Sequence, residues 1–342
     1  MSGSRLALFA KQLAYYLSGR FLRPRLDVVF VTPPKDAGGW ILDGICQEIA
    51  SRLPAGVTRA MVCSDQQLPL ADRYFYSHYM YFFSSLSKLS APNYKGNFVF
   101  FTHLEESKHN LSDARIFGLL GLCDGIICMN SDAKSVLIRN AIDTGKVSVA
   151  VGGADEDFFH PTERAQDGAI GFVSAYYERK NPDLMLEIIQ RLPERHFILL
   201  GKNWEKYDRF DELQAGKNLE YVNAPYAQYP EIYKRMSVFV STSTLEGGPI
   251  PLLEAMMSNV VPVVSTTGFA RDVVQHGTNG YLFDPESDAA EVVRLINDAY
   301  ALDVDVRASA MPFSWTHFTH QVQTALGLNS RTVDSRPSGT VT

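Results

Sequence analysis

The sequence predicts an α/β protein made of two Rossmann-like lobes, each with a parallel sheet, and a cleft between the lobes. Short apolar runs rich in branched residues alternate with helical patterns along most of the 342 residues, which is the order of a doubly wound sheet. This alternation stops in the polar stretch Glu163–Gly168 and then begins again. A chain of this length is also too long for one ordinary core, so two domains are expected.

The composition excludes several classes of protein. With 46% hydrophobic and 20% charged residues, the chain has the make-up of a soluble globular enzyme and not of a disordered or fibrous protein. Its net charge of −6 provides no general attraction to nucleic acid, so no nucleic-acid partner is expected. No run is long and apolar enough to span a bilayer. Buried reduced thiols, which favour the cytoplasm, are predicted for the four cysteines, because they lie in apolar surroundings without CxxC or zinc-ligand spacing: Cys46, Cys63, Cys123 and Cys128.

Residues 1–25 form a basic N-terminal segment with no acidic side chain before Asp27. Its apolar positions fall roughly on one helical face, and no clean cleavage site follows, so a secretory peptide is not expected. A basic amphipathic helix of this kind can lie on an anionic membrane surface, which here is the inner face of the membrane. The alternative is a helix that packs on the first lobe with its basic side chains in solvent, and both remain open.

The first predicted lobe runs over residues 26–161. It begins with the apolar strand Leu26–Val31, and Gly38 and Gly39 then precede a helical pattern at 41–53. This is a first strand–turn–helix unit, with its glycine turn at the carboxyl end of the strand. The glycines do not have GxGxxG spacing, which argues against a nicotinamide cofactor.

A buried strand at Phe98–Thr102 places His103 at its carboxyl end. Ligands bind at the carboxyl ends of strands in open α/β sheets, so His103 is a candidate site residue, with a purely structural histidine as the alternative. Further along, Asn130 and Ser131 precede a helical pattern, and Ser131 is the candidate N-cap.

Two other features of this lobe allow more than one interpretation. Seven aromatic residues crowd into positions 74–83, which predicts core or inter-helix packing, with an acceptor surface for sugar rings or lipid headgroups as the alternative. The acidic triplet Asp155–Asp157 has the residue types of a metal site. No additional ligand cluster accompanies it, so we expect the chain to leave the lobe there and no metal to bind.

The second predicted lobe runs over residues 162–311. Its expected strands are 170–174, 197–200, 220–222, 238–240 and 260–265, and its expected helices are 182–191, 229–236 and 288–300. Residues 312–328 form a separate helical segment. The tail 329–342 is rich in Ser, Thr, Pro and Gly and is expected to be disordered.

The stretch Ser241–Glu254 carries the strongest chemical signal. It has a strand–turn–helix order, and Gly247 and Gly248 in the turn let the backbone approach a ligand closely. The amides at the start of the following helix favour an anion. Glu246 lies in the turn and Glu254 in the helix, with seven residues between them. A pyrophosphate on the amides and a polyol on the carboxylates would suit this arrangement, so the stretch predicts a nucleotide-sugar site.

From residue 26 to residue 328 the sequence resembles the GT-B glycosyltransferases, specifically the retaining, glycogen-synthase-like group called glycosyltransferase family 4. The segment Glu246–Met256 carries the Glu-x7-Glu motif of that group. Asn279–Phe283 resembles the segment after its nucleotide-binding loops, and Gly153–Pro161 resembles its interdomain crossing. Phe313–Trp315 is similar to the start of the helix that returns to the first lobe.

The resemblance implies a role for each candidate site residue. Glu254 would hold the ribose hydroxyls of the donor, while Glu246 and the four residues that follow it would meet the donor sugar and the diphosphate: Gly247, Gly248, Pro249 and Ile250. Lys180 would neutralise the diphosphate, and His103 would be a catalytic residue beside the donor sugar, where it would orient a hydroxyl or share a proton. The glycine turn at 38–39 would approach both donor and acceptor.

One family residue is absent. An arginine usually follows the strand glycine, but here Phe172 follows Gly171, so Arg179 or Lys202 would have to supply that charge.

The resemblance also implies the reaction. An acceptor hydroxyl would attack the sugar on the face that the nucleoside diphosphate leaves, with retention of configuration and without a protein nucleophile. The donor would be a nucleotide-diphosphate sugar, the acceptor a glycan or a lipid-linked precursor, and no metal or other cofactor would be needed. The alternatives are a catalytically silent nucleotide-sugar binding protein, or an epimerase or phosphorylase on the same scaffold.

Overall fold

The computed structural model describes residues 26–34, 40–87, 96–104, 110–161, 163–164 and 167–328. The N-terminal segment, the Gly38–Gly39 turn and the tail 329–342 therefore lie outside the described residues. In the part of the chain that is described, no helix has both the length and the apolar character needed to cross a membrane.

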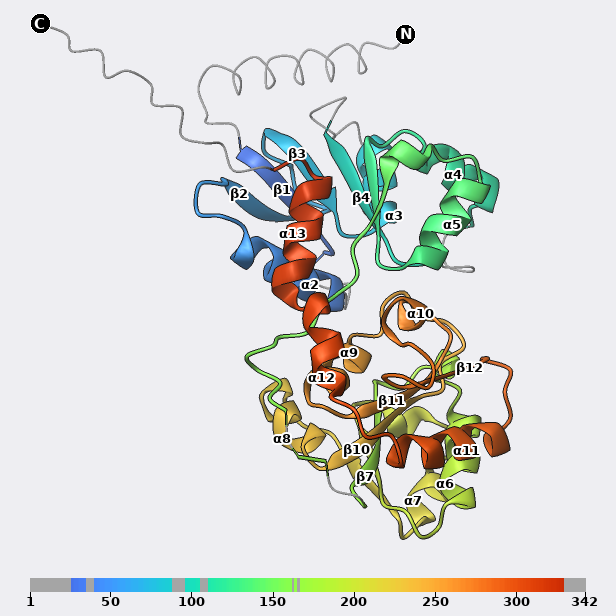
Figure 1. Cartoon of the computed structure of the whole chain (residues 1–342). Coiled ribbons are helices and arrows are strands. Elements are labelled where there is room, and N and C mark those ends of the chain that lie inside the picture. The colour runs from blue at the N-terminus through green and yellow to red at the C-terminus, as the bar shows by residue number, and fades with distance from the viewer. Residues whose placement is uncertain are drawn as a thin grey trace, which may run out of the picture.

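Two six-stranded sheets, all of whose strand pairs are parallel, form the two lobes (Figure 1). The first sheet has the order β2-β1-β3-β4-β5-β6, and its strands are β1 (Leu26–Thr32), β2 (Arg59–Cys63), β3 (Ala71–Tyr76), β4 (Asn97–Phe101), β5 (Gly125–Cys128) and β6 (Val147–Val149). The second has the order β12-β11-β10-β7-β8-β9, and its strands are β7 (Ala169–Val173), β8 (Phe197–Leu200), β9 (Leu219–Val222), β10 (Met236–Ser241), β11 (Val261–Ser265) and β12 (Tyr281–Phe283). The predicted fold class, with two Rossmann-like lobes, is confirmed.

Helices cover these sheets and connect their strands. In the first lobe they are α2 (Trp40–Arg52), α3 (Tyr79–Ser87), α4 (Asp113–Leu120), α5 (Ser131–Arg139) and the 3₁₀ helix η1 (Thr144–Lys146). In the second lobe they are η2 (Glu178–Lys180), α6 (Pro182–Arg191), η3 (Trp204–Lys206), α7 (Phe210–Ala215), η4 (Tyr226–Gln228), α8 (Tyr229–Tyr233), α9 (Ile250–Met257), α10 (Ala270–Val273), α11 (Ala289–Tyr300) and α12 (Val306–Ala310). The chain then continues through η5 (Met311–Phe313) into α13 (Trp315–Ala325).

The aromatic stretch belongs to the core of the first lobe. Residues 74–76 are the end of strand β3, and residues 79–83 are the beginning of helix α3. The sequence did not predict this division into a strand and a helix. Tyr74, Tyr76, Tyr79 and Phe82 are buried, and the Phe82 ring meets the Tyr76 ring edge-on at 5.3 Å. The packing interpretation is therefore correct for these residues, which offer no surface to an acceptor.

The N-cap of α5 differs from the prediction. Asn130, not Ser131, caps this helix, because the Asn130 side chain accepts a hydrogen bond from the Ala133 N–H at 2.6 Å. The Ser131 hydroxyl is thereby released from the helix and instead donates to Asp272 of the second lobe.

The two lobes are joined by two chain crossings that run side by side. At Ala154 the first crossing pairs with Ser314 of the second, and the Trp315 N–H donates to the Ala154 carbonyl at 2.9 Å. Beyond this point α13 packs against α2 in the first lobe (Figure 1). The Gly153 backbone has φ of +125°, and a β-carbon there would lie 2.9 Å from the Trp315 ring. A glycine is therefore required where the crossings meet.

We expect Gly153→Ala to lower the free energy of unfolding by about 2–4 kcal/mol, because it adds backbone strain and a clash with Trp315. Gly277→Ala is the matched control, since Gly277 has φ of +75° with open space around its β-carbon position. Strain alone should cost that variant about 1–2 kcal/mol. Urea unfolding of both variants measures the difference, and equal losses would contradict a role for the Trp315 contact.

Candidate functional site

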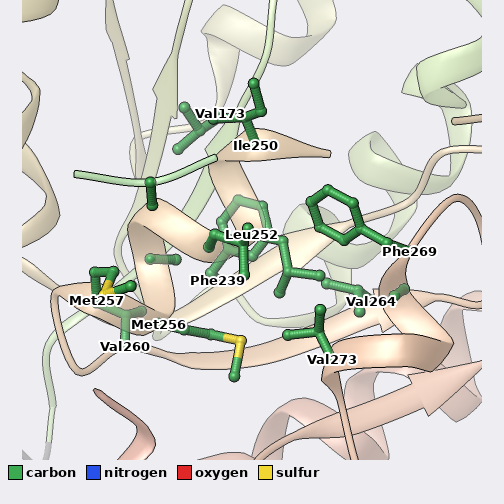
Figure 2. Packing of buried hydrophobic residues seen from close by; sticks show 14 of the residues in the cluster. Val173, Phe239, Ile250, Leu252, Met256, Met257, Val260, Val264, Phe269 and Val273 are labelled. Atoms are coloured by element: carbon green, nitrogen blue, oxygen red, sulfur yellow. The ribbon is translucent and has the colours of Figure 1, made fainter. Parts of the chain in front are cut away.

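The loop between β10 and α9 rests on a rigid apolar base. All residues of α9 except Pro251 are buried, Glu254 among them. Figure 2 shows Leu252 and Met256 of this helix packed among apolar side chains that include Phe239 of β10 and Val264 of β11. Because the helix cannot shift in this packing, the direction of its first amides is fixed as well.

Glu246 in this loop is buried and bound by two cations. Its Oε1 accepts hydrogen bonds from Lys180 Nζ and, at 2.7 Å, from the Ser243 hydroxyl. Its Oε2 accepts from Arg179 Nη1 at 2.9 Å, and the same Nη1 donates to the Leu245 carbonyl at 2.7 Å. Both predicted basic residues, Arg179 and Lys180, therefore meet the first predicted glutamate.

The charge of this cluster is positive overall. Burial by itself would raise the pKa of Glu246, but the charges of Lys180 and then Arg179 bring that pKa below its ordinary value. Glu246 therefore stays ionised, and two cations against one carboxylate leave one positive charge in excess. Arg179 is 36% exposed and Lys180 14% exposed, so a ligand anion can reach this excess charge from solvent.

Backbone contacts hold the two cations in place. The Thr242 hydroxyl donates to the Lys180 carbonyl at 2.7 Å, and the Thr244 N–H donates to the Arg179 carbonyl at 2.8 Å. Asn181, in the left-handed region with φ of +51°, ends η2 and caps α6 through its side chain. The loop after β7 and the loop after β10 are thus one hydrogen-bonded unit.

The glycine turn touches the first lobe directly. A β-carbon on Gly247 would lie 2.6 Å from Thr102 Cβ and 3.1 Å from His103 Nδ1, and one on Gly248 would lie 2.4 Å from Met129 Cε. His103 belongs to the first lobe and Gly247 to the second, so the two lobes meet at this turn. The N–H groups of Gly247 and Gly248 have no acceptor within the described residues, so both can donate to a ligand. Pro249 and Ile250 follow as the start of α9.

Glu254 is a buried carboxylate without a cation. It is 2% exposed, and its two oxygens accept hydrogen bonds from Tyr226 at 2.7 Å and from Tyr233 at 2.9 Å. Burial raises the pKa of Glu254 to about 7, because these two hydrogen bonds offset only part of the desolvation. Sequence reasoning missed both tyrosines. Their one signal was a repeat of Tyr at 226, 229 and 233, at helical spacing ahead of the motif.

Lys202 and Phe172 form no hydrogen bond or ion pair with Glu246 or Glu254 within the described residues. Lys202 follows β8 with an exposed side chain, and it is Arg179 that contacts Glu246. Phe172 is buried and stacks on Phe197 at 6.0 Å, so the position after Gly171 faces the core. The Gly38–Gly39 turn lies outside the described residues.

The acidic triplet has a structural role in the crossing between the lobes. Asp155 Oδ1 accepts hydrogen bonds from the N–H groups of Asp157 and Phe158, and Oδ2 pairs with Arg52 Nη2 at 3.3 Å. In the described part of the chain, this triplet included, no three His, Cys, Asp or Glu side chains are grouped so as to hold a metal ion.

Known proteins resemble this chain both in sequence and in fold. Residues 154–310 match the family Glycosyl transferases group 1. The HepE protein of Anabaena, solved in complex with UDP and glucose, has the same fold, with a TM-score of 0.70 at 14% identity over 89% of this chain and 100% of that one. The chain has the GT-B fold, and its residues 154–310 match a glycosyltransferase family.

Two curated glycosyltransferases are similar to this one in sequence. Glycogen synthase 2 of Geobacter sulfurreducens is 38% identical over 114 residues, which are 31% of this chain and 23% of the relative. UDP-Gal:alpha-D-GlcNAc-diphosphoundecaprenol alpha-1,3-galactosyltransferase of Escherichia coli is 26% identical over 199 residues, which are 51% of each protein. The match thus spans about half or less of the length of these relatives.

The raised pKa of Glu254 predicts a pH-dependent stability. The folded protein keeps the Glu254 proton up to about pH 7, whereas an ordinary glutamate loses it near pH 4.5. Between these values the folded state binds more protons than the unfolded state, so stability falls as pH rises. Relative to Glu254→Gln, the wild type should lose about 3 kcal/mol between pH 4.5 and pH 8. Urea unfolding across this range tests this, and parallel curves for the two proteins would contradict it.

Proposed function

We propose that this protein transfers a sugar from a nucleotide-diphosphate donor to a hydroxyl group, with retention of configuration. The observation that carries this proposal is the excess positive charge of Lys180 and Arg179 around Glu246, next to two N–H groups of the glycine turn that have no acceptor within the described residues. A diphosphate needs cations and N–H donors converging on one place.

The leaving diphosphate gains negative charge as the bond to the sugar breaks. Lys180, Arg179 and the amides of Gly247 and Gly248 would stabilise that charge, because they are held in position before the reaction begins. We therefore propose no metal or other cofactor, since these two side chains supply the positive charge. Both carboxylate oxygens of Glu246 face Lys180 and Arg179, and its pKa is lowered, so it is suited to hold the cations and poorly suited to act as a base. Because both oxygens are bound to cations, Glu246 is also a poor nucleophile, which supports same-face attack by the acceptor hydroxyl without a protein nucleophile.

Glu254 would bind the ribose of the donor. Each carboxylate oxygen can accept more than one hydrogen bond, so the two tyrosines leave acceptor sites for the ribose hydroxyls. His103, beside Gly247, would orient a hydroxyl of the donor sugar.

The acceptor and the cellular setting are proposed from the relatives and the thiols. A glycan or a lipid-linked precursor is the acceptor that the diphosphoundecaprenol relative supports, and the neighbour solved with UDP and glucose supports a uridine nucleotide donor. Cys46, Cys123 and Cys128 are buried free thiols and Cys63 is partly buried, which suits the reducing cytoplasm. Contact of residues 1–25 with the inner face of the membrane stays a prediction.

A silent nucleotide-sugar binding protein is the second candidate. It is favoured by Phe172, which is buried and stacked where the related enzymes have an arginine. Incubation with a panel of uridine, guanosine and deoxythymidine diphosphate sugars, with and without acceptors, separates the two. Release of nucleoside diphosphate supports transfer, whereas tight binding without release supports the silent protein.

In that assay we expect Lys180→Gln to lower kcat by a factor of about 10²–10³, because a preorganised donor to the developing charge is lost. Lys217→Gln is the matched control, since Lys217 is exposed and lies before β9, away from the loops of the site. Steady-state release of UDP measures both. Equal activity of the two variants would contradict the role of Lys180.

Binding of UDP should strengthen with pH, because an ionised Glu254 accepts the ribose hydroxyls better than its protonated form. A pKa of about 7 leaves roughly 3% of Glu254 ionised at pH 5.5 and roughly 90% at pH 8, so affinity should rise by up to roughly 30-fold. Deoxythymidine diphosphate carries the same diphosphate but lacks the 2′-hydroxyl, so it should gain less. Calorimetric titration at both pH values tests this, and equal gains for both ligands would exclude Glu254 as the cause.

A further inference from the structure

The start of α5 in the first lobe contacts the second lobe at two places, the glycine turn of the site and helix α10. Asn130 Nδ2 donates to the Gly247 carbonyl at 2.7 Å. The Ser131 N–H and hydroxyl donate to the two carboxylate oxygens of Asp272, at 3.0 and 2.5 Å. Asp272 lies in α10 and Gly247 in the loop before α9, so one helix start joins the lobes at two points.

Asn130 is buried where the two lobes meet. It is 3% exposed, and its side-chain oxygen accepts from the Ala133 N–H, which fixes which end of the amide is the donor. The Nδ2 group then faces two carbonyl oxygens, that of Gly247 and, at 3.5 Å, that of Thr102. Thr102 directly precedes His103, so Asn130 lies between the strand end that carries His103 and the glycine turn.

The bond to Gly247 sets the orientation of a peptide group. In a trans peptide the C=O and the N–H point in opposite directions, and the Gly247–Gly248 peptide is trans. Holding the Gly247 carbonyl toward Asn130 therefore turns the Gly248 N–H away from Asn130, and within the described residues that N–H has no acceptor. Two consecutive glycines can rotate this peptide easily, so its orientation needs an outside restraint.

We propose that Asn130 is a positioning residue for sugar transfer: it orients the Gly247–Gly248 peptide so that the Gly248 N–H is presented to the donor diphosphate or sugar. This rests on the proposed function. Because Asn130 belongs to the first lobe, the orientation exists only when the lobes are together. The Ser131–Asp272 contact holds the lobes at the same place but does not touch the peptide.

Asn130→Asp separates the two roles of the side chain. Aspartate keeps the acceptor that caps α5, and it is as good an N-cap as asparagine. Its second carboxylate oxygen, however, would face the Gly247 carbonyl in place of a donor, so the peptide is expected to turn. The midpoint of thermal unfolding should therefore change little. Asn130→Ser is the second variant, because serine also caps the helix but is too short to meet Gly247.

Titration with uridine and with UDP is the decisive measurement. Uridine carries the ribose without the diphosphate, so we expect its affinity to be unchanged in both Asn130 variants, while UDP binds about tenfold more weakly and kcat with a productive donor falls further. Ser131→Ala is the matched control, which should affect uridine and UDP equally.

Two results would overturn the proposal. One is a folded Asn130→Asp protein that binds UDP as the wild type does, and the other is an equal loss of uridine and UDP affinity. The two binding measurements need no turnover. A wild type that binds UDP but releases none from any donor sugar would therefore count against the transferase function and leave the test of Asn130 intact.

Discussion

A carboxylate buried between two cations holds the site together. Glu246 could not remain ionised in the interior without Lys180 and Arg179, and removing one partner of such a buried pair typically costs about 3–5 kcal/mol. The pairing in turn holds both basic side chains at the start of α9 before any ligand arrives. Because the cations outnumber the carboxylate, the same interaction that stabilises the loop also prepares it for an anion.

The second glutamate has the opposite electrostatics, although only seven residues of the chain separate it from the first. Glu254 is surrounded by tyrosine hydroxyls and apolar groups, so its pKa is raised to about 7, whereas that of Glu246 is lowered. A permanent charge suits a residue that holds cations for a diphosphate. At Glu254 a charge is costly, so the carboxyl group keeps its proton up to about pH 7 and becomes the better acceptor of hydroxyl hydrogen bonds only above that pH. The two glutamates look equivalent in the sequence motif, but their surroundings shift their pKa values in opposite directions.

The glycine turn connects this chemistry to the arrangement of the lobes. Gly247 and Gly248 approach Thr102 and Met129 so closely that no side chain fits between them. The first lobe therefore forms one wall of the proposed donor site through the carboxyl ends of β4 and β5. Asn130 adds a directed hydrogen bond to this contact, so the packing of the lobes and the orientation of the glycine turn are determined together.

The sequence by itself determined the two-lobe α/β fold, because alternating strand and helix patterns are local properties of the chain. It also determined the position of His103 at a strand end and of the two glutamates around a glycine turn, since each follows directly from a neighbouring strand or helix. Only the tertiary structure decided which groups these residues meet: Arg179 at Glu246, Tyr226 and Tyr233 at Glu254, and Asn130 at Gly247. These partners lie between 21 and 117 positions apart in the chain, and no periodic pattern encodes such pairs. The N-cap of α5 shows the same limit, because Ser131 is a good cap by local preference but its hydroxyl donates to Asp272 in the other lobe.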